Sequence, residues 1–301
     1  MKRNDETKWR QRLGVIRKAV RRGAFAKTAL QPTKLDIRFT LGDKLTDEQL
    51  SFFDKNGMIV FRNFLPKETV QLFISELQRI EREWLAQGVE KINGVPLKFG
   101  KDEHGNPTLQ RLCFLNKYSD AMRDCLRDPR LQALLELMKP YEGRIAEDEK
   151  DGLILNNYVR TPNSAFTQMG WHTDSPRDLF LGQRIMPMLN VGIHLDECLF
   201  EHGGLRVIPG THKQSIFRLL FGKKYFIDHN PDPREAGADI YAGDLTVHDG
   251  RIWHRAQRSP FLGEQSRRRV LYVPVVTGKY MPKNENSKTP FYHRLAQTIQ
   301  N

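Results

Sequence analysis

The sequence predicts an α+β fold in which helices come first and a mainly β core follows, all within one large domain. Before residue 152, apolar residues recur at helical spacing in several segments. After Gly152, short apolar or alternating runs are separated by Gly, Pro, Asp and Asn, which is typical of a β-sandwich or β-barrel. The 301 residues contain no internal repeat and suffice for one large domain with extensions. We therefore expect helices packed on the outside of a β core.

The helical part is expected to begin with a capped helix, a strand and a longer helix. Thr46 can cap the first helix, with Gln49 at the capping-box position and Asn56-Gly57 as a favourable end. Residues 58–64 then read as a strand, and Pro66 opens the second helix. Its apolar residues share one face: Val70, Phe73, Leu77, Ile80 and Trp84.

Further along the chain, residues 88–112 read as a loop or hairpin and residues 129–139 as a third helix. The β core is expected from five runs: LILNNYV (153–159), MPMLNVGIHL (186–195), GLRVIPG (204–210), DLTVHDG (244–250) and RRVLYVPVV (268–276).

The positive charge of the chain is concentrated near its N-terminus. Residues 1–36 hold eleven Lys/Arg against three acids, which accounts for +8 of the net charge of +12. The apolar residues of this stretch follow one helical face: Trp9, Leu13, Ile16 and Val20. Such a basic amphipathic helix could bind nucleic acid, an anionic membrane or a partner, or could pack on its own domain. We expect a basic arm over residues 1–43 and a folded domain over residues 44–301.

Composition argues against several other classes of protein. No apolar run approaches the roughly 18 residues of a membrane span, and MKRNDETKWRQR is charged where a secretory signal needs an apolar core. Cys113, Cys125 and Cys198 are scattered and odd in number, which disfavours a disulfide framework or a thiolate zinc site. We therefore expect a cytoplasmic protein without a transmembrane segment.

The first candidate for chemistry is GWHTDSP at residues 170–176. His172 and Asp174 are separated by one residue, so on a strand both side chains point to the same face and could reach one ion. A 2-His-1-carboxylate set holds non-haem Fe(II) and leaves positions open for a co-substrate and O2. Because a His-x-Asp pair alone is common by chance, the interpretation depends on a second histidine.

That histidine is expected from GDLTVHDGRIWHRAQRS at residues 243–259. His254 follows a turn at Asp249-Gly250, so it can sit on a returning strand and face the interior. It lies 82 positions after His172, which would let two remote strands meet at an ion. His248, one turn earlier, is the alternative, and its other role would be hydrogen bonding in the hairpin.

A dicarboxylate co-substrate such as 2-oxoglutarate would also need a buried cation for its far carboxylate. Arginine suits this task because its planar fork matches a carboxylate. Arg267, Arg268 and Arg269 lead into the apolar strand 270–276. Strand alternation turns Arg268 to one face and the other two to the opposite face. A buried core accepts an arginine only where an anion meets it, so an inward-facing member of this run is the candidate.

Five segments occur in an order that matches one known family. LTDEQLSFFDKNGMIVFRNFLPKETV resembles its opening helix, strand and helix, and GWHTDSP resembles its His-x-Asp segment. HGGLRVIPGTHK resembles its strand-turn signature, GDLTVHDGRIWHRAQRS the segment of its distal histidine, and SRRRVLYVPVV its arginine strand. Over roughly residues 44–276 the chain thus resembles the phytanoyl-CoA dioxygenase family of Fe(II)/2-oxoglutarate-dependent oxygenases. The basic arm lies outside the resemblance.

The resemblance implies a double-stranded β-helix (a cupin-like jelly roll) with flanking helices mostly from the N-terminal part. It implies the Fe(II) ligands His172, Asp174 and His254, with 2-oxoglutarate and O2 as co-substrates. It also implies that Arg268 binds 2-oxoglutarate. Many relatives have Gly-Ser after the distal histidine where this chain has Arg255-Ala256, so Arg267 and Arg269 stay open as alternatives to Arg268.

Three further residues are expected around the same pocket. The resemblance suggests that Gln168 and Asn157 line it near co-substrate or substrate; the alternative is hydrogen bonding inside the barrel. Trp171, beside a ligand, is expected to wall the substrate pocket or else to fill the core.

The implied function is that of a dioxygenase. It would hydroxylate or otherwise oxidise an unactivated C–H bond of a small molecule and decarboxylate 2-oxoglutarate to succinate and CO2. Because Asp174 is present, hydroxylation or a related oxidation is favoured over halogenation. One alternative is a non-catalytic barrel that its basic arm recruits to nucleic acid or membrane, and another is a zinc hydrolase with the same ligands. A complete ligand set favours the oxygenase, for which no nucleic-acid partner is expected.

The segment 214–242 is the expected source of substrate contacts. It combines aromatic residues with lysines: Phe217, Phe221, Tyr225, Phe226, Lys223 and Lys224. Segments this long are usually functional or disordered. A lid that grips an acidic or phosphorylated small molecule would fit this composition, and so would a helix packed on the barrel.

Overall fold

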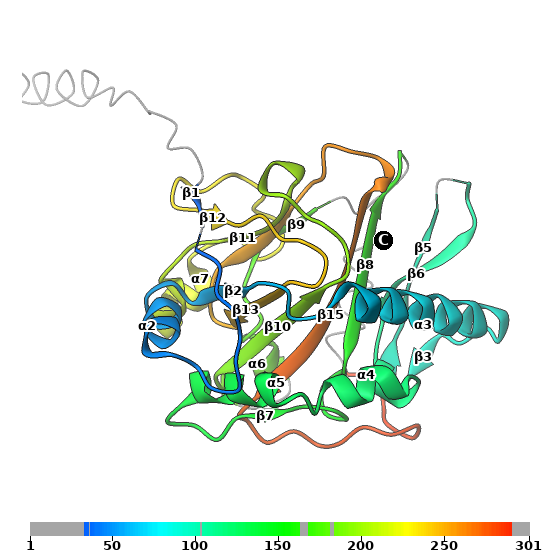
Figure 1. Cartoon of the computed structure of the whole chain (residues 1–301), viewed down its shortest axis with the longest axis horizontal. Helices are drawn as coiled ribbons and strands as arrows, with labels where there is room; N and C mark the ends of the chain where they lie inside the picture. The colour runs from blue at the N-terminus through cyan, green and yellow to red at the C-terminus, as the bar shows by residue number, and fades with distance from the viewer. Residues whose placement is uncertain (1–32, 36, 103, 163–167, 181–183, 291–301) are drawn as a thin grey trace, which may run out of the picture.

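The computed structural model of the chain describes residues 33–290 except 36, 103, 163–167 and 181–183. Two large sheets form its core (Figure 1). The first has five strands in the order β1-β12-β11-β14-β9, and the second has the order β2-β13-β10-β15-β8-β6-β5, with β7 paired to β15. The predicted amphipathic helix of the basic arm lies outside the described residues.

The five-stranded sheet consists of β1 (Thr33–Lys34), β12 (Ala236–Gly237), β11 (Gly204–Val207), β14 (His254–Gln257) and β9 (Met169–His172). The larger sheet consists of β2 (Met58–Phe61), β13 (Leu245–Asp249), β10 (Met188–His194), β15 (Gly263–Val276), β8 (Ile154–Arg160), β6 (Pro107–Leu112), β5 (Lys98–Lys101) and β7 (Arg144–Ile145). A separate hairpin joins β3 (Lys91–Ile92) and β4 (Val95–Pro96).

The helices are α2 (Asp47–Asn56), α3 (Lys67–Ala86), α4 (Asp120–Cys125), α5 (Pro129–Ala133), α6 (Arg177–Phe180) and α7 (Ile216–Phe221). Short 3-10 turns are η1 (Leu115–Lys117), η2 (Leu134–Met138), η3 (Phe200–His202) and η4 (Thr211–Lys213). None of the described helices is both long and apolar enough to cross a membrane.

Alternation along the strands gives the large sheet two different faces. On β10, Leu189, Val191 and Ile193 belong to the main apolar core, which also includes the buried face of α3. Asn190 and His194 alternate with them and therefore point into the space between the two sheets. Figure 1 shows α2 and α3 beside this sheet and α4 and α5 near one end of β15. The helices thus cover the outer face of the sheet, and the inner face is left for polar chemistry.

The N-terminal elements form for the expected reasons. The Thr46 hydroxyl accepts from the amide of Gln49 at 3.2 Å, and the Gln49 side chain accepts in return from the Thr46 amide at 3.0 Å. Helix α2 ends at Gly57, whose φ of 74° suits glycine. Residues 88–112 form the hairpins β3–β4 and β5–β6, as predicted. The third helix is shorter than predicted, because α5 gives way to the 3-10 turn η2.

The described part of the predicted arm packs on the barrel. Strand β1 pairs in parallel with β12, and Phe39 forms a bridge with Phe61. The Arg38 guanidinium makes an ion pair with Asp244, whose side chain is buried. The folded domain therefore begins before residue 44.

The packing of α3 on the sheet generates a stability prediction. Phe73 is 1% exposed, whereas its neighbour Leu72 is 47% exposed. Phe73→Ala should lower the free energy of unfolding by about 3–5 kcal/mol, because the cavity adds to the lost burial. Leu72→Ala should change it by less than about 1 kcal/mol. Urea denaturation measures both variants, and equal losses would contradict this packing.

Candidate metal centre

The register between β9 and β14 brings two histidines together. His172 and His254 are direct partners in this antiparallel pair, so their side chains share one face, with ring centroids 4.1 Å apart. The chain then turns, and the amides of Asp174 and Ser175 donate to the Gly250 carbonyl at 2.8 and 3.1 Å. This turn brings an Asp174 carboxylate oxygen to 3.4 Å from Nε2 of His254.

The three predicted ligands form one cluster. A donor atom from each of His172, Asp174 and His254 lies within 4.8 Å of the others. Nδ1 of His172 lies 2.8 Å from the Gly170 carbonyl, and Nδ1 of His254 lies 3.1 Å from the Ile252 carbonyl. Because a carbonyl can only accept, each Nδ1 carries the proton, and each Nε2 keeps its lone pair for a metal ion.

The electrostatics of the cluster also favour a cation. Burial lowers the pKa of both His172 and His254, so both imidazoles are neutral ligands at pH 7. Burial opposes the Asp174 carboxylate, but the attraction of His254 and the other nearby histidines outweighs it, and its pKa is lowered. The amide of Asn190 donates to Asp174 Oδ2 and fixes the carboxylate. Two neutral imidazoles and one carboxylate fit the predicted Fe(II).

His248 lies close to the cluster without joining it. Its Nε2 is 3.9 Å from Asp174 Oδ2 and 3.4 Å from the Asn190 amide, and its Nδ1 is buried without a hydrogen bond to any described residue. The set that could hold an ion includes His254 and not His248. The structure therefore supports His254 over the alternative that the sequence left open.

The three consecutive arginines differ in their partners. Arg269 pairs with Asp196 at 2.6 Å, and Arg267 pairs with Glu264. Arg268 is the register partner of Tyr158 on β8 and alternates into the space between the sheets. Its Nη1 donates to the Gln257 carbonyl at 3.1 Å, and its Nε is buried without a partner. Among the described residues, Arg268 has no carboxylate partner, so its charge is available to an anion.

Two tyrosines share this interior. Burial raises the pKa of both Tyr158 and Tyr272, so both phenols stay neutral at pH 7. Tyr158 is the register partner of Arg268, and Asp174 and Arg268 act electrostatically on the pKa of both tyrosines, so both belong to the same interior. The sequence analysis missed these tyrosines and Asn190, although strand alternation could have assigned all three to the inner face.

Two predicted pocket residues lie on the opposite faces of their sheets. Asn157 is the register partner of Arg269, on the face opposite Arg268, and its amide donates to the Leu109 carbonyl at 3.3 Å. Trp171 is fully buried on the face of β9 opposite His172, and its indole N–H donates to the Asn230 carbonyl at 2.8 Å. Both residues therefore face away from the side of their sheets that carries Arg268 or His172, because adjacent strand positions face opposite ways, and their place at the pocket stays a prediction.

The third pocket residue, Gln168, is half-buried and immediately precedes β9. Its place near co-substrate or substrate stays a prediction.

Residues 226–228 of the segment 214–242 pack along β9, the last strand of the five-stranded sheet. The Trp171 amide donates to the Asp228 carbonyl at 2.8 Å, and the Phe226 amide donates to the Trp171 carbonyl at 2.9 Å. A buried two-pronged ion pair joins Arg255 to Glu235, with N–O distances of 2.8 and 3.0 Å. Arg255 thus anchors this segment to the barrel.

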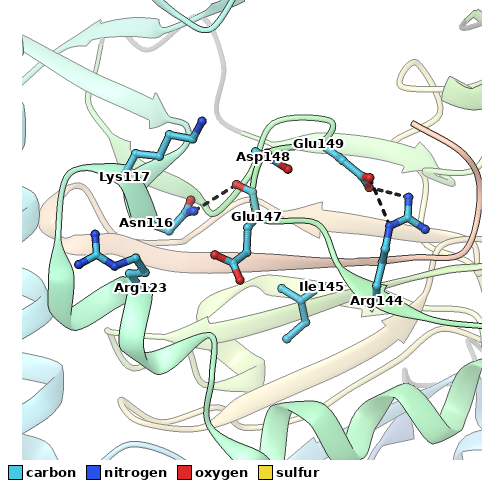
Figure 2. A pocket seen from close by; sticks show the side chains of 8 residues that line it. All are labelled: Asn116, Lys117, Arg123, Arg144, Ile145, Glu147, Asp148 and Glu149. Atoms are coloured by element: carbon cyan, nitrogen blue, oxygen red, sulfur yellow. Dashed lines mark hydrogen bonds and ion pairs between the residues drawn. The ribbon is translucent and has the colours of Figure 1, made fainter. Parts of the chain in front are cut away.

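A separate surface pocket of about 620 Å³ does not contain the ligand cluster. It is lined by Asn116, Lys117, Arg123, Arg144, Ile145, Glu147, Asp148 and Glu149. Figure 2 shows that several of its polar groups bond to one another: Asn116 donates to the Glu147 carbonyl at 3.1 Å, and Arg144 pairs with Glu149 at 2.7 Å. The candidate site is therefore the His-Asp-His cluster between the sheets.

Fold and cluster together define a double-stranded β-helix protein with a 2-His-1-carboxylate site. The chain matches the family model described as phytanoyl-CoA dioxygenase (PhyH) over residues 53–268 and belongs to that family. The resemblance and the fold class predicted from the sequence are thereby confirmed. Among curated proteins, no relative of the chain was found.

Several solved structures share the fold at low sequence identity. The non-heme alpha ketoglutarate dependent carbocyclase SnoK from nogalamycin biosynthesis has 15% identity and a TM-score of 0.57, covering 86% of this chain and 93% of that chain. The epimerase SnoN of the same biosynthesis has 16% identity and a TM-score of 0.54, covering 80% and 86%. HygX from Streptomyces hygroscopicus, with nickel and 2-oxoglutarate bound, has 18% identity and a TM-score of 0.55, covering 77% and 87%.

The geometry of the cluster predicts which histidine binds metal. His254→Ala should weaken Co(II) binding by more than about 100-fold, because even loss of a group that only orients a ligand costs about 10–100-fold. His248→Ala should change the affinity by less than about tenfold, since His248 lies outside the ligand set. Anaerobic titration followed by Co(II) absorbance compares them, and the reverse order of effects would refute the assignment.

Proposed function

We propose that this protein is an Fe(II)/2-oxoglutarate-dependent dioxygenase that hydroxylates, or otherwise oxidises, a C–H bond of a small molecule. Membership of the phytanoyl-CoA dioxygenase family supports the class. The observation that carries the proposal is that a largely buried His-Asp-His set shares one interior with Arg268, which has no acid partner among the residues that the structure describes. A barrel that had lost its catalytic function would not be expected to retain both the three ligand residues and the inward-facing arginine.

The ligand residues would perform the binding steps. His172, Asp174 and His254 would hold Fe(II) through two Nε2 atoms and one carboxylate oxygen. When bound, Fe(II) with 2-oxoglutarate supplies the oxidation of the substrate C–H bond by O2, with release of succinate and CO2. Asn190 would keep Asp174 oriented while co-substrate and substrate exchange.

Arg268 would hold the far carboxylate of 2-oxoglutarate. An interior cation without an acid partner fits a dicarboxylate that brings its own negative charge. The neutral phenols of Tyr158 and Tyr272 would donate hydrogen bonds in the same space without repelling the anion. The outward-facing Arg267 and Arg269 already pair with acids, so they are not the anchors.

The carboxylate ligand also bears on the reaction type. Asp174 would supply the carboxylate ligand in whose place a halide would have to bind, so hydroxylation or a related oxidation is the favoured outcome. The fold neighbours include an epimerase and a carbocyclase, so an oxidation without net hydroxylation belongs to the same proposal. A zinc hydrolase with the same ligands would leave the arginine without a role. We propose a small-molecule substrate and no nucleic-acid partner.

The proposed anchor generates a prediction for co-substrate affinity. Arg268→Ala should raise the KM for 2-oxoglutarate by at least about 30-fold, which corresponds to about 2 kcal/mol for a buried charge pair. Arg267→Ala is the matched control, because Arg267 points to the other face and pairs with Glu264. It should change the KM by less than about threefold.

Succinate release with Fe(II) and 2-oxoglutarate, measured without added substrate, provides the assay. A wild-type protein that binds Fe(II) but never converts 2-oxoglutarate would refute the dioxygenase proposal. An unchanged KM in Arg268→Ala would refute the anchor alone.

A further inference from the structure

One aromatic residue beside the ligand cluster has an unusual conformation. Phe226 has a φ of 61°, in the left-handed region that bulky side chains rarely adopt. Its ring stacks on the imidazole of His172, with centroids 4.8 Å apart and an interplanar angle of 26°. Even so, the residue is 55% exposed. A buried core would gain little from such a residue, whereas a site that receives a substrate would offer the open ring face as a contact.

The segment that carries Phe226 is held rigidly. Backbone hydrogen bonds on both sides of Trp171 pin residues 226 and 228 to the edge of β9. The buried Arg255–Glu235 pair anchors the end of the segment, and Arg255 also donates to the His229 carbonyl at 2.8 Å. The position of the ring is therefore set by the barrel.

Tyr225, which precedes Phe226, contacts the chain between the ligands His172 and Asp174. The Tyr225 hydroxyl lies 2.7 Å from the Thr173 hydroxyl, and Thr173 is the middle residue of the His-x-Asp motif. The Tyr225 ring packs on Trp253, with centroids 4.7 Å apart. Tyr225 thus stabilises the chain between His172 and Asp174. The left-handed backbone conformation of Phe226 places its ring against His172.

We propose that Phe226 is the substrate-facing wall of the metal site, and that without substrate its own ring is oxidised. The proposal rests on the proposed dioxygenase function. A ring stacked on a ligand imidazole is adjacent to the ion that this imidazole would hold, and the open ring face is where a substrate would pack. The substrate contact that fits is an apolar or cyclic face, which stacks on an aromatic ring.

The oxidation balances with the co-substrates of the proposed function. One aromatic C–H bond of Phe226 becomes C–OH, and its oxygen atom comes from O2. The other oxygen atom enters the new carboxylate of succinate as 2-oxoglutarate loses CO2. The product is a hydroxyphenylalanine at position 226, and no further reductant is consumed.

Peptide mass spectrometry tests the oxidation directly. Trypsin cuts after Lys224 and Arg234, so Phe226 lies in the peptide 225–234, whereas Phe217 and Phe221 lie in the peptides 214–218 and 219–223. Incubation with Fe(II), 2-oxoglutarate and ¹⁸O2 should add one labelled oxygen to residue 226. Phe217 and Phe221 are each 70% exposed, so they are internal controls for oxidation by iron in solution.

Two variants sharpen the assignment. Phe226→Leu should abolish the added oxygen at position 226, and Phe221→Leu, the matched exposed control, should leave the yield at Phe226 unchanged. Equal oxidation of all three phenylalanine peptides would overturn the proposal, because random oxidation follows exposure. Consumption of 2-oxoglutarate with no oxygen at residue 226 would also overturn it.

A second readout requires only the metal. In protein labelled with 4-fluorophenylalanine, the ¹⁹F resonance that disappears in Phe226→Leu should be broadened strongly when Co(II) binds. The resonances assigned in the same way to Phe217 and Phe221 should be broadened less. Saturating Co(II) binding without broadening at position 226 would overturn the location of the wall. Broadening at position 226 without any conversion of 2-oxoglutarate would instead leave the wall in place and refute the dioxygenase function.

Discussion

The register that sets His172 opposite His254 is the constraint on which the rest of the site depends. Antiparallel partners share a face, so the pairing of β9 with β14 brings two imidazoles from segments 82 positions apart to one point. A shift of β9 by one residue would turn the His172 ring to the other face, where Trp171 is now buried, and would leave His254 without its partner. The chain turns directly after β9, and the Gly250 carbonyl fixes this turn by accepting from the Asp174 amide. The turn places the Asp174 carboxylate beside the two imidazoles.

Charge pairing divides the barrel into an outer and an inner surface. Outside, Arg269 and Arg267 are neutralised by acids close to the same strand. Inside, Nη1 of Arg268 donates to a backbone carbonyl, whereas its Nε has no hydrogen-bond partner among the described residues, an arrangement that suits an incoming anion. Arg255 also points outside, where its pair with Glu235 holds the edge segment beside the ligands. Strand alternation thus separates the acid-paired arginines of the outer face from Arg268, the proposed anchor on the inner face.

The same rule explains what the sequence could and could not predict. Composition and spacing predicted the β core and the capped helix after Thr46, because these depend on local patterns. For the third ligand the residues alone left His248 open beside His254, and the family resemblance implied His254, which the structure places with His172 and Asp174. The faces on which Asn157 and Trp171 lie could not be assigned from the sequence alone, because neighbouring residues on a strand point to opposite faces and only the strand pairing shows which face is the inner one. The anchoring of residues 214–242 depends on Arg255 and Glu235, which are 20 positions apart in a stretch without regular spacing. Such long-range pairs leave no local pattern.

Anaerobic absorption spectroscopy of the reconstituted protein tests the central claim, that one interior holds both Fe(II) and 2-oxoglutarate, most directly. Fe(II) and 2-oxoglutarate added together should produce a weak visible charge-transfer band that neither produces alone. The band should be missing in His172→Ala and retained in Arg267→Ala, whose substitution lies on the outer face. A wild-type protein that demonstrably binds both Fe(II) and 2-oxoglutarate yet shows no such band would contradict the account.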